Sequence, residues 1–104
     1  MDVSVVIPVF NSADIVEQTV DAVTEVMSPR AGRYEIVLVD DGSADDSWKV
    51  LSKLAADRDD IRTIRLERNF GEQSAVLCGI RAARLDVIVT IDDEDAATLA
   101  ILSS

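Results

Sequence analysis

Runs of consecutive apolar residues alternate along this chain with segments whose apolar residues recur every three or four positions. The continuous runs are rich in β-branched residues and predict strands that are buried on both faces of a parallel sheet. They fall at residues 3–7, 34–39 and 87–91. A fourth segment, residues 61–66, alternates apolar and polar residues and predicts a less buried strand, at an edge of the sheet.

The segments between these strands have helical spacing. Helices are predicted from 15 to 27, from about 44 to 55 and from 72 to 84, with Asn11 or Ser12 capping the first. Trp48 is expected to be a core anchor of the second helix. Small residues on one side of the third should let that helix lie close to the sheet: Ala75, Gly79, Ala82 and Ala83.

The resulting order is β-α-β-α-β-α-β, with connections too long for hairpins. Such alternation predicts a three-layer α/β fold with a Rossmann-like parallel sheet and right-handed crossovers. With 104 residues the chain forms one domain at most. Pro8 is expected to end the first strand, and residues 96–104 have no clear partner.

Composition narrows the choice of ligands. The chain carries 20 acidic and 10 basic side chains, a net charge of −10 and no histidine. This balance argues against nucleic acid and anionic membranes as partners, and it leaves acid–base or metal chemistry to carboxylates. The lone Cys78 fits a small core residue and a reducing compartment. No apolar run is long enough to span a bilayer, and the start lacks a signal peptide, so a cytoplasmic location is expected.

Two predicted strands end in acidic residues. Asp40 and Asp41 follow the second strand, and Asp92-Asp93-Glu94-Asp95 follow the fourth. In open parallel sheets, ligands bind outside the carboxyl ends of the strands. Clustered carboxylates suit Mg²⁺ or Mn²⁺, which would bridge the protein to a diphosphate. A helix-capping turn and a solvated loop remain the alternative interpretations of the two clusters.

Two common phosphate-binding motifs are absent. The loop after the first strand reads Pro8-Val9-Phe10-Asn11-Ser12-Ala13 and has no glycine, so the dinucleotide-binding fingerprint is missing. The chain has no G-K-[ST] sequence, which excludes a P-loop. A receiver-like signalling domain is disfavoured because its paired acids would follow the first strand.

Four segments in register resemble the motifs of family 2 glycosyltransferases: V-V-I-P-V-F-N at 5–11, E-I-V-L-V-D-D-G-S at 35–43, R-N-F-G at 68–71 and T-I-D-D-E at 90–94. The R-N-F-G segment makes the likeness greatest to polyprenyl-phosphate (dolichyl-phosphate) sugar transferases. The resemblance implies a GT-A fold with strand order 3-2-1-4, and a nucleotide-diphosphate sugar, UDP- or GDP-linked, as ligand.

The resemblance also implies roles for individual residues. Base and ribose would be held by Pro8, Phe10, Val39 and Asp41, and the further ligand-binding candidates are Asn11, Gly42 and Asp93. Asp92 and Glu94 would be the metal-binding D-x-D motif, with Asp93 and Asp95 as an alternative register. Three positions depart from the family pattern, in which tyrosine, glutamate and aspartate are usual: Phe10, Ser12 and Glu94.

Residues 1–95 would then be the nucleotide-binding half of a GT-A domain, and 96–104 a tail. The parent enzyme is expected to transfer a sugar, with inversion, to an acceptor such as polyprenyl phosphate, and the 104-residue chain alone to be inactive. A non-catalytic nucleotide- or metal-binding module is the alternative. The strand at 87–91 would be an exposed edge, which predicts a homodimer.

Overall fold

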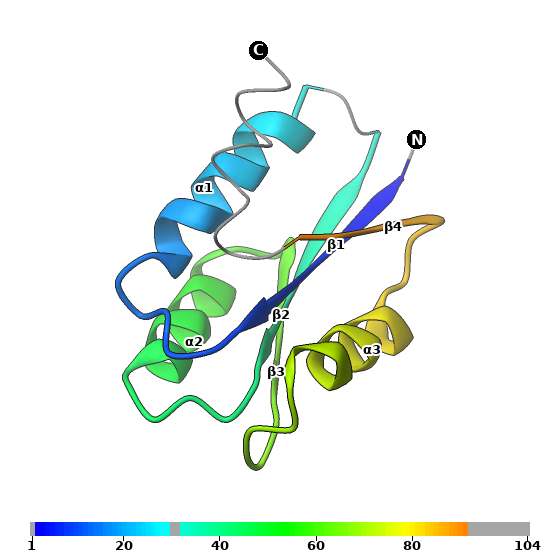
Figure 1. Ribbon diagram of the computed structural model, residues 1–104. Helices are drawn as coiled ribbons and strands as arrows, with labels where there is room; N and C mark the ends of the chain where they lie inside the picture. The colour runs from blue at the N-terminus through cyan, green and yellow to red at the C-terminus, as the bar shows by residue number, and fades with distance from the viewer. Residues whose placement is uncertain (1, 30–31, 92–104) are drawn as a thin grey trace.

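The computed structural model describes residues 2–29 and 32–91, which form a four-stranded parallel sheet with helices on both faces (Figure 1). The strand order is β3-β2-β1-β4, which confirms the predicted fold class and order. The elements, in chain order, are β1 (Val3–Val9), α1 (Val16–Met27), β2 (Tyr34–Asp40), α2 (Ser47–Asp57), β3 (Ile61–Arg65), α3 (Glu72–Ala82) and β4 (Val87–Thr90).

The alternation of side chains along β1 and β2 supplies both faces of the sheet with apolar surface. Odd positions of β1 and even positions of β2 pack beneath α1 and α2, as Val5 and Ile36 do. Val6, Val37 and Val39 point to the opposite face and pack against Ala75 of α3. The three layers seen in Figure 1 follow from this double burial.

The small residues of α3 have the predicted effect. A Cβ placed on Gly79 would collide with Cγ1 of Val6 and lie 3.2 Å from Cγ2 of Val39. The helix therefore sits closer to β1 and β2 than one with a larger residue here would allow. Cys78, on the same helix, is only partly buried.

The prediction that Pro8 ends the first strand was wrong, because β1 continues to Val9 and Pro8 pairs in register with Val39. The carbonyl of Val6 accepts a hydrogen bond from Ile91, so alternate residues of β1, Pro8 included, turn their backbone polar groups toward β4. The β1–β4 register ends at Val6, before Pro8. The missing N–H of the proline therefore removes no hydrogen bond from this register.

The predicted cap of the first helix was also wrong. Helix α1 begins at Val16, and its N-cap, Ile15, makes no side-chain capping bond. The side chain of Asn11 instead accepts a hydrogen bond from the backbone N–H of Ala44, in the loop after β2. Of the described helices, α1 is the longest, with 12 residues, and none of them is long and apolar enough to cross a membrane.

A buried polar cluster pins the start of β4 to the amino ends of β1 and β2. Oε2 of Glu35 accepts hydrogen bonds from Oγ of Ser4 (2.6 Å) and from the backbone N–H of Arg84 (2.7 Å). Its other carboxylate oxygen is 3.2 Å from Nη1 of Arg62. The Ser4 hydroxyl in turn accepts the N–H of Leu85. Glu35 thus ties together three strands and the α3–β4 connection.

We expect Glu35→Gln to lower the free energy of unfolding at pH 7 by about 1.5–3 kcal/mol, the contribution of hydrogen bonds to a charged group. Burial raises the pKa of Glu35, but the bonds from Ser4, Arg84 and Arg62 outweigh it, and the pKa is lowered. A lowered folded-state pKa gives stability that is present above the unfolded value and is lost as the pH falls through the folded value. The difference between wild type and variant should therefore begin to shrink as the pH falls below the ordinary glutamate pKa of about 4.3, and should vanish only below the lowered folded-state pKa.

Urea unfolding of both proteins from pH 7 to pH 3 measures this difference. Glu25→Gln is the matched control, because Glu25 is exposed on α1 and the charge change is the same. A difference that is independent of pH would contradict the assignment of the effect to the Glu35 carboxylate.

Candidate functional site

The neighbouring carboxylates of Asp40 and Asp41 point to opposite faces of the sheet, as alternation along a strand requires. Asp40 lies on the α2 side with 0% exposure, where Oδ1 accepts the N–H of Ser43 and Oδ2 is 4.0 Å from Nε of Arg65. Asp41 lies on the α3 side and is 3% exposed. Of the two adjacent acids that the sequence places at the ligand-binding edge of the sheet, only Asp41 lines the pocket. The expectation of a ligand site formed by both is therefore wrong for Asp40, whose carboxylate binds within the turn after β2.

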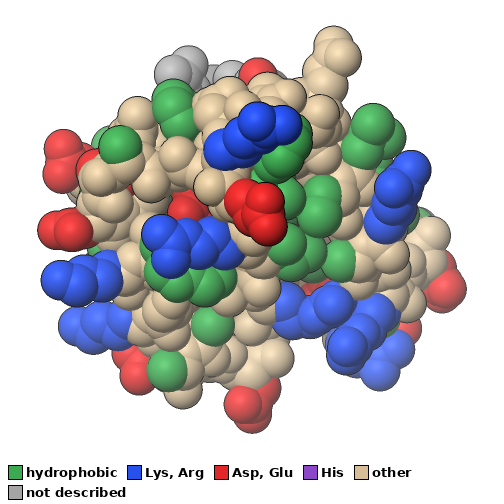
Figure 2. Space-filling model, turned by 90° about the horizontal axis from the view of Figure 1, so that it is seen from below, with side chains coloured by type: hydrophobic (Ala, Val, Ile, Leu, Met, Phe, Trp, Pro, Cys, Tyr) green, Lys and Arg blue, Asp and Glu red, His purple; other side chains and the backbone are tan. Residues whose placement is uncertain are grey.

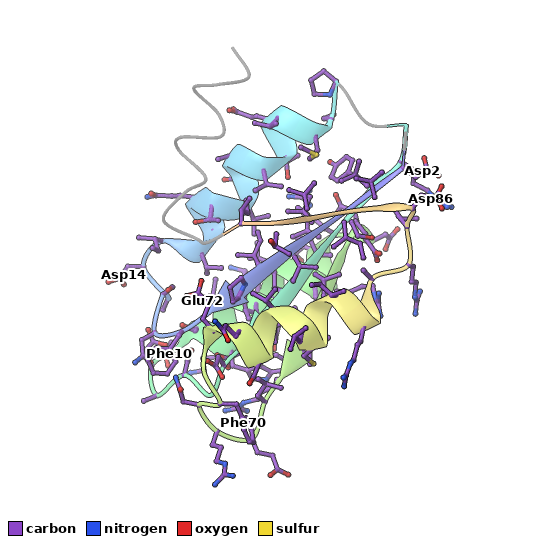
Figure 3. The ribbon with its side chains drawn as sticks, turned by 45° about the vertical axis from the view of Figure 1, so that its right-hand side comes forward. Asp2, Phe10, Asp14, Phe70, Glu72 and Asp86 are labelled. Atoms are coloured by element: carbon purple, nitrogen blue, oxygen red, sulfur yellow. The ribbon has the colours of Figure 1, made fainter. Side chains whose placement is uncertain are left out.

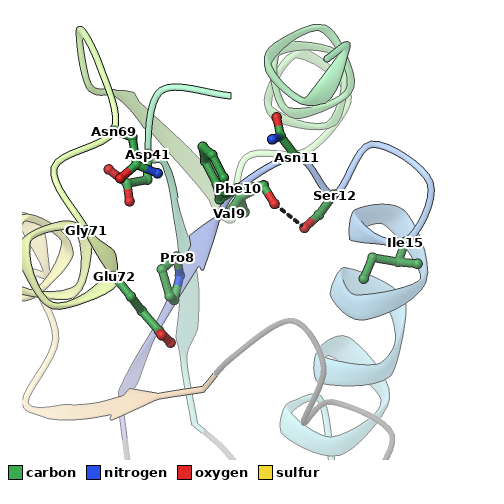
Figure 4. A pocket seen from close by; sticks show the side chains of 10 residues that line it. All are labelled: Pro8, Val9, Phe10, Asn11, Ser12, Ile15, Asp41, Asn69, Gly71 and Glu72. Atoms are coloured by element: carbon green, nitrogen blue, oxygen red, sulfur yellow. Dashed lines mark hydrogen bonds between the residues drawn. The ribbon is translucent and has the colours of Figure 1, made fainter. Parts of the chain in front are cut away.

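The pocket lies at the carboxyl ends of β1 and β2 and has a volume of about 480 Å³, within the range of small-molecule sites. One wall is the β1–α1 loop (residues 10–15), and the other is formed by the β3–α3 loop (residues 66–71) and the start of α3 (Figure 4). Asp41 and Pro8 lie between the walls. The described lining residues are Pro8, Val9, Phe10, Asn11, Ser12, Ile15, Asp41, Asn69, Gly71 and Glu72.

The β1–α1 loop is held by the β2–α2 loop (residues 41–46) and by the first residue of α2. Asn11 donates its backbone N–H to Oγ of Ser43 (2.9 Å) and accepts the N–H of Ala44 on Oδ1 (2.8 Å). Ser12 donates its N–H to Oγ of Ser47 (2.9 Å). Asn11 adopts a positive φ of 49°, which asparagine tolerates better than most residues. This wall is therefore fixed by contacts between residues more than 30 positions apart.

The β3–α3 loop is held by Asp40 and Asp41, at the junction of β2 and the β2–α2 loop. The N–H of Phe70 donates to Oδ1 of Asp41 (2.8 Å), and the N–H of Leu66 donates to the carbonyl of Asp40 (2.9 Å). Asp41 also donates its own N–H to the carbonyl of Val9. Gly42 packs directly against the backbone of residues 68 and 69.

Exposed aromatic side chains stand at this end of the molecule. Phe10 and Phe70 are each 47% exposed, and Figure 3 shows both at the end of the sheet opposite Asp2 and Asp86. The guanidinium of Arg68 lies over the ring of Phe70, 4.8 Å from its centre. Seen from below, in Figure 2, the surface mixes basic, acidic and hydrophobic side chains instead of showing one sign of charge.

The charges of the lining itself are one-sided. Asp41 and Glu72 are carboxylates, and none of the described lining residues is a lysine or an arginine. Polyanionic ligands such as diphosphates would meet repulsion here unless a cation accompanied them. Within residues 2–29 and 32–91, no group of three or more acidic, cysteine or histidine side chains is arranged to hold a metal ion.

The predicted ligand residues divide into three groups. Pro8, Phe10, Asn11 and Asp41 line the pocket. Val39 and Gly42 are absent from the lining: the Val39 side chain is buried against α3, and Gly42 contacts the β3–α3 loop. Asp92, Asp93 and Glu94, with the predicted metal site and the 96–104 tail, lie outside the described residues.

Sequence reasoning gave no ligand role to several lining residues. Asn69 and Gly71 belong to the R-N-F-G segment, and Glu72 opens α3. Their signal was available, because this segment follows the carboxyl end of a predicted strand. Its position on the α3 side of Asp41 depends on the chain path, which local patterns do not encode.

The sequence profile described as "Glycosyl transferase family 2" matches residues 4–99. The chain is 41% identical over 91 residues to an undecaprenyl-phosphate 4-deoxy-4-formamido-L-arabinose transferase of Yersinia pestis (strain Pestoides F). The same figures hold for the enzyme of Yersinia pseudotuberculosis serotype O:3 (strain YPIII). The match covers 86% of this chain but only 28% of the length of the Yersinia pestis relative.

Solved structures with the same fold include a mannosyltransferase from Pyrobaculum calidifontis in complex with GDP-Man and Mn²⁺. It aligns with a TM-score of 0.78 and 24% identity, over 98% of this chain and 32% of that one. The TarS protein of S. aureus, in complex with UDP-GlcNAc, aligns with a TM-score of 0.76 and 21% identity, over 94% of this chain and 30% of its own. These likenesses establish the fold of the described sheet.

Proposed function

Because the chain belongs to glycosyl transferase family 2, we propose that its pocket binds the nucleotide diphosphate of a sugar donor through a divalent cation. The parent enzyme would transfer the sugar, with inversion, to an acceptor such as polyprenyl phosphate. Support for the acceptor class comes from the relative in Yersinia pestis, whose name gives undecaprenyl phosphate. Residues 1–95 would be the donor-binding half of the enzyme, and a cytoplasmic location stays a prediction.

One observation carries the donor part of this proposal. A pocket of about 480 Å³ opens at the carboxyl ends of β1 and β2, with the exposed ring of Phe10 and the carboxylate of Asp41 in its lining. A flat apolar ring suits stacking with a base, and a carboxylate suits a ribose hydroxyl or a base N–H. Oδ1 of Asp41 accepts the N–H of Phe70, which leaves Oδ2 available for a ligand.

The cation supplies the charge that the pocket lacks, and we assign it to Asp92 and Glu94. The N–H of Ile91 donates to the carbonyl of Val6, two residues before Pro8 in the pocket lining. The acidic run of residues 92–95 therefore follows directly in sequence after a residue that is bonded to β1 three residues before the carboxyl end of that strand. When bound, the ion would offset the charge of the diphosphate and bind its oxygens.

We expect Asp92→Ala and Glu94→Ala each to weaken Mn²⁺-dependent binding of UDP or GDP by about tenfold or more, the contribution of one charge-assisted contact. Asp95→Ala, which removes an equal charge from the same run, is the matched control and should change the affinity far less. Calorimetric titration measures all three variants. If Asp93→Ala and Asp95→Ala prove to be the damaging pair, the D-x-D motif lies one residue later.

A thermal-shift panel tests the donor proposal. UDP, GDP, UDP-GlcNAc and GDP-mannose are each added with Mn²⁺, and at least one is expected to raise the melting temperature. Uridine and guanosine, which lack phosphates, are the matched controls. Failure of all four phosphorylated ligands to stabilise the protein would overturn the proposal.

The non-catalytic alternative predicts binding without turnover. For these 104 residues assayed alone we expect binding of a donor without transfer of its sugar, because they span only 28% of the length of the Yersinia pestis relative. Incubation with a radiolabelled donor and undecaprenyl phosphate measures transfer. A labelled lipid product formed by these residues alone would overturn this expectation.

The edge strand gives a prediction about assembly. Within the described residues, β4 pairs with β1 on one side only, and Ile88 on this strand is 41% exposed. Unprotected edges pair readily with other chains. We therefore expect a symmetric homodimer at high micromolar concentration, measured by size-exclusion chromatography with light scattering. Ile88→Lys should shift the protein toward monomer, and a wild type that is monomeric throughout would refute the dimer.

A further inference from the structure

The β2–α2 loop contacts both walls of the pocket, although only Asp41 of this loop lines it. Toward the β1–α1 loop it offers Oγ of Ser43 and the N–H of Ala44. Toward the β3–α3 loop it offers Asp41 and Gly42. The separation of the two walls is therefore set by a segment that lies between them.

At Gly42 the β2–α2 loop packs directly against the backbone of the β3–α3 loop. Its φ is +71°, a conformation that L side chains rarely adopt. A Cβ here would lie 2.7 Å from Cα of Arg68 and closer still to the carbonyl carbon of Arg68 and the amide nitrogen of Asn69. These are backbone atoms, so relief requires the two loops to move apart.

Asp41 fixes the same loop by a bond. It is anchored to β1 through its N–H, which donates to Val9, and its Oδ1 holds the N–H of Phe70. The residues on either side of Phe70, Asn69 and Gly71, both line the pocket. A shift of the loop would therefore move part of the pocket wall.

We infer that Gly42 is a positioning residue: by lacking a side chain it seats the β3–α3 loop on Asp41 and so sets the width of the pocket. The inference rests on the proposed function for its ligand, a nucleoside diphosphate. It assigns Gly42 a role different from the ligand contact that the family resemblance implies. The glycine acts through the backbone of residues 68–70 and touches no ligand.

Two substitutions separate the possible reasons for glycine at this position. Gly42→Ala adds a Cβ and also strains a positive φ. Gly42→Asn adds the same Cβ, but asparagine tolerates the left-handed region better. If the close approach to Arg68 matters, both variants should have the same defect, whereas rescue by asparagine would mean that only the backbone conformation is required.

The readouts are hydrogen exchange at the Phe70 amide, followed by ¹⁵N spectroscopy, and calorimetric affinity for UDP and GDP with Mn²⁺. In both variants we expect the Phe70 amide to exchange about tenfold faster or more, as loss of a bond to a carboxylate implies. Affinity should fall by about tenfold or more, because small displacements of a site are costly. Gly79→Ala is the control: it overpacks α3 against Val6, and should lower stability without either effect.

Unchanged Phe70 exchange in Gly42→Ala, or recovery of exchange and affinity in Gly42→Asn, overturns the inference. If Gly42→Ala does not fold, Asp41→Ala tests the same anchor through Phe70 exchange without adding an atom, and continued protection overturns it. If the wild type binds neither nucleotide, the proposed ligand fails, while Phe70 exchange still decides whether Gly42 seats the loop.

Discussion

In Asp41→Ala, the affinity for UDP or GDP in the presence of Mn²⁺ is expected to fall by roughly ten- to a hundredfold, since hydrogen bonds to charged groups contribute about 1.5–3 kcal/mol. Asp41 is 3% exposed and lies between the two pocket walls. Its removal takes away the ligand partner and also frees the N–H of Phe70. Isothermal titration with each nucleotide measures the loss.

Two further variants divide this effect. Asp41→Asn keeps an oxygen that can accept the Phe70 N–H but removes the charge, so a loss of affinity in this variant belongs to the ligand. Asp14→Ala removes an exposed carboxylate of the β1–α1 loop that does not line the pocket, and it should bind like the wild type. Unchanged affinity in Asp41→Ala would make Asp41 an anchor for the loop and nothing more.

When the divalent cation is removed with EDTA, UDP or GDP is expected to give no thermal stabilisation. With Mn²⁺ and ligand at 100 times its dissociation constant, binding adds about 2.7 kcal/mol, which corresponds to roughly 10–20 °C in a domain of this size. The physical reason is charge: the described lining has two carboxylates and no basic side chain, in a chain of net charge −10.

The controls for this experiment are Mn²⁺ without nucleotide, and nucleotide with Mn²⁺ restored after EDTA. Restored Mn²⁺ should return the full shift, which excludes irreversible damage by the chelator. Equal stabilisation in EDTA and in Mn²⁺ would show that the diphosphate is held without a metal bridge, and Asp92 and Glu94 would lose their proposed role.

The pattern of apolar and polar residues by itself determined the layers and the edge of the sheet that carries the pocket, whereas the strand order was implied by the family resemblance. Apolar runs such as 36–39 can be buried only between two layers of helices, and helical spacing between strands requires crossovers that leave all strands parallel. Parallel strands bring their carboxyl ends to one edge, so the sequence alone places Pro8 and Asp41 at the same edge. The spacing of apolar residues reveals the helices, the strands and their buried faces, because each residue's burial depends on its position in the repeat of its own element.

Only the tertiary structure decided what each residue at that edge contacts. Asp40 and Asp41 are adjacent in sequence but serve opposite faces, and the side chain of Asn11 bonds to Ala44 instead of capping its own helix. Gly42 lies in a loop whose sequence is typical of ligand binding, but it packs against the backbone of Arg68. Each of these contacts joins segments about 25 to 35 positions apart, or depends on which way a strand's alternation points. The local sequence pattern determines which residues of one helix or strand are buried. Which loops meet depends on how the helices and strands pack, because their packing decides where their ends lie.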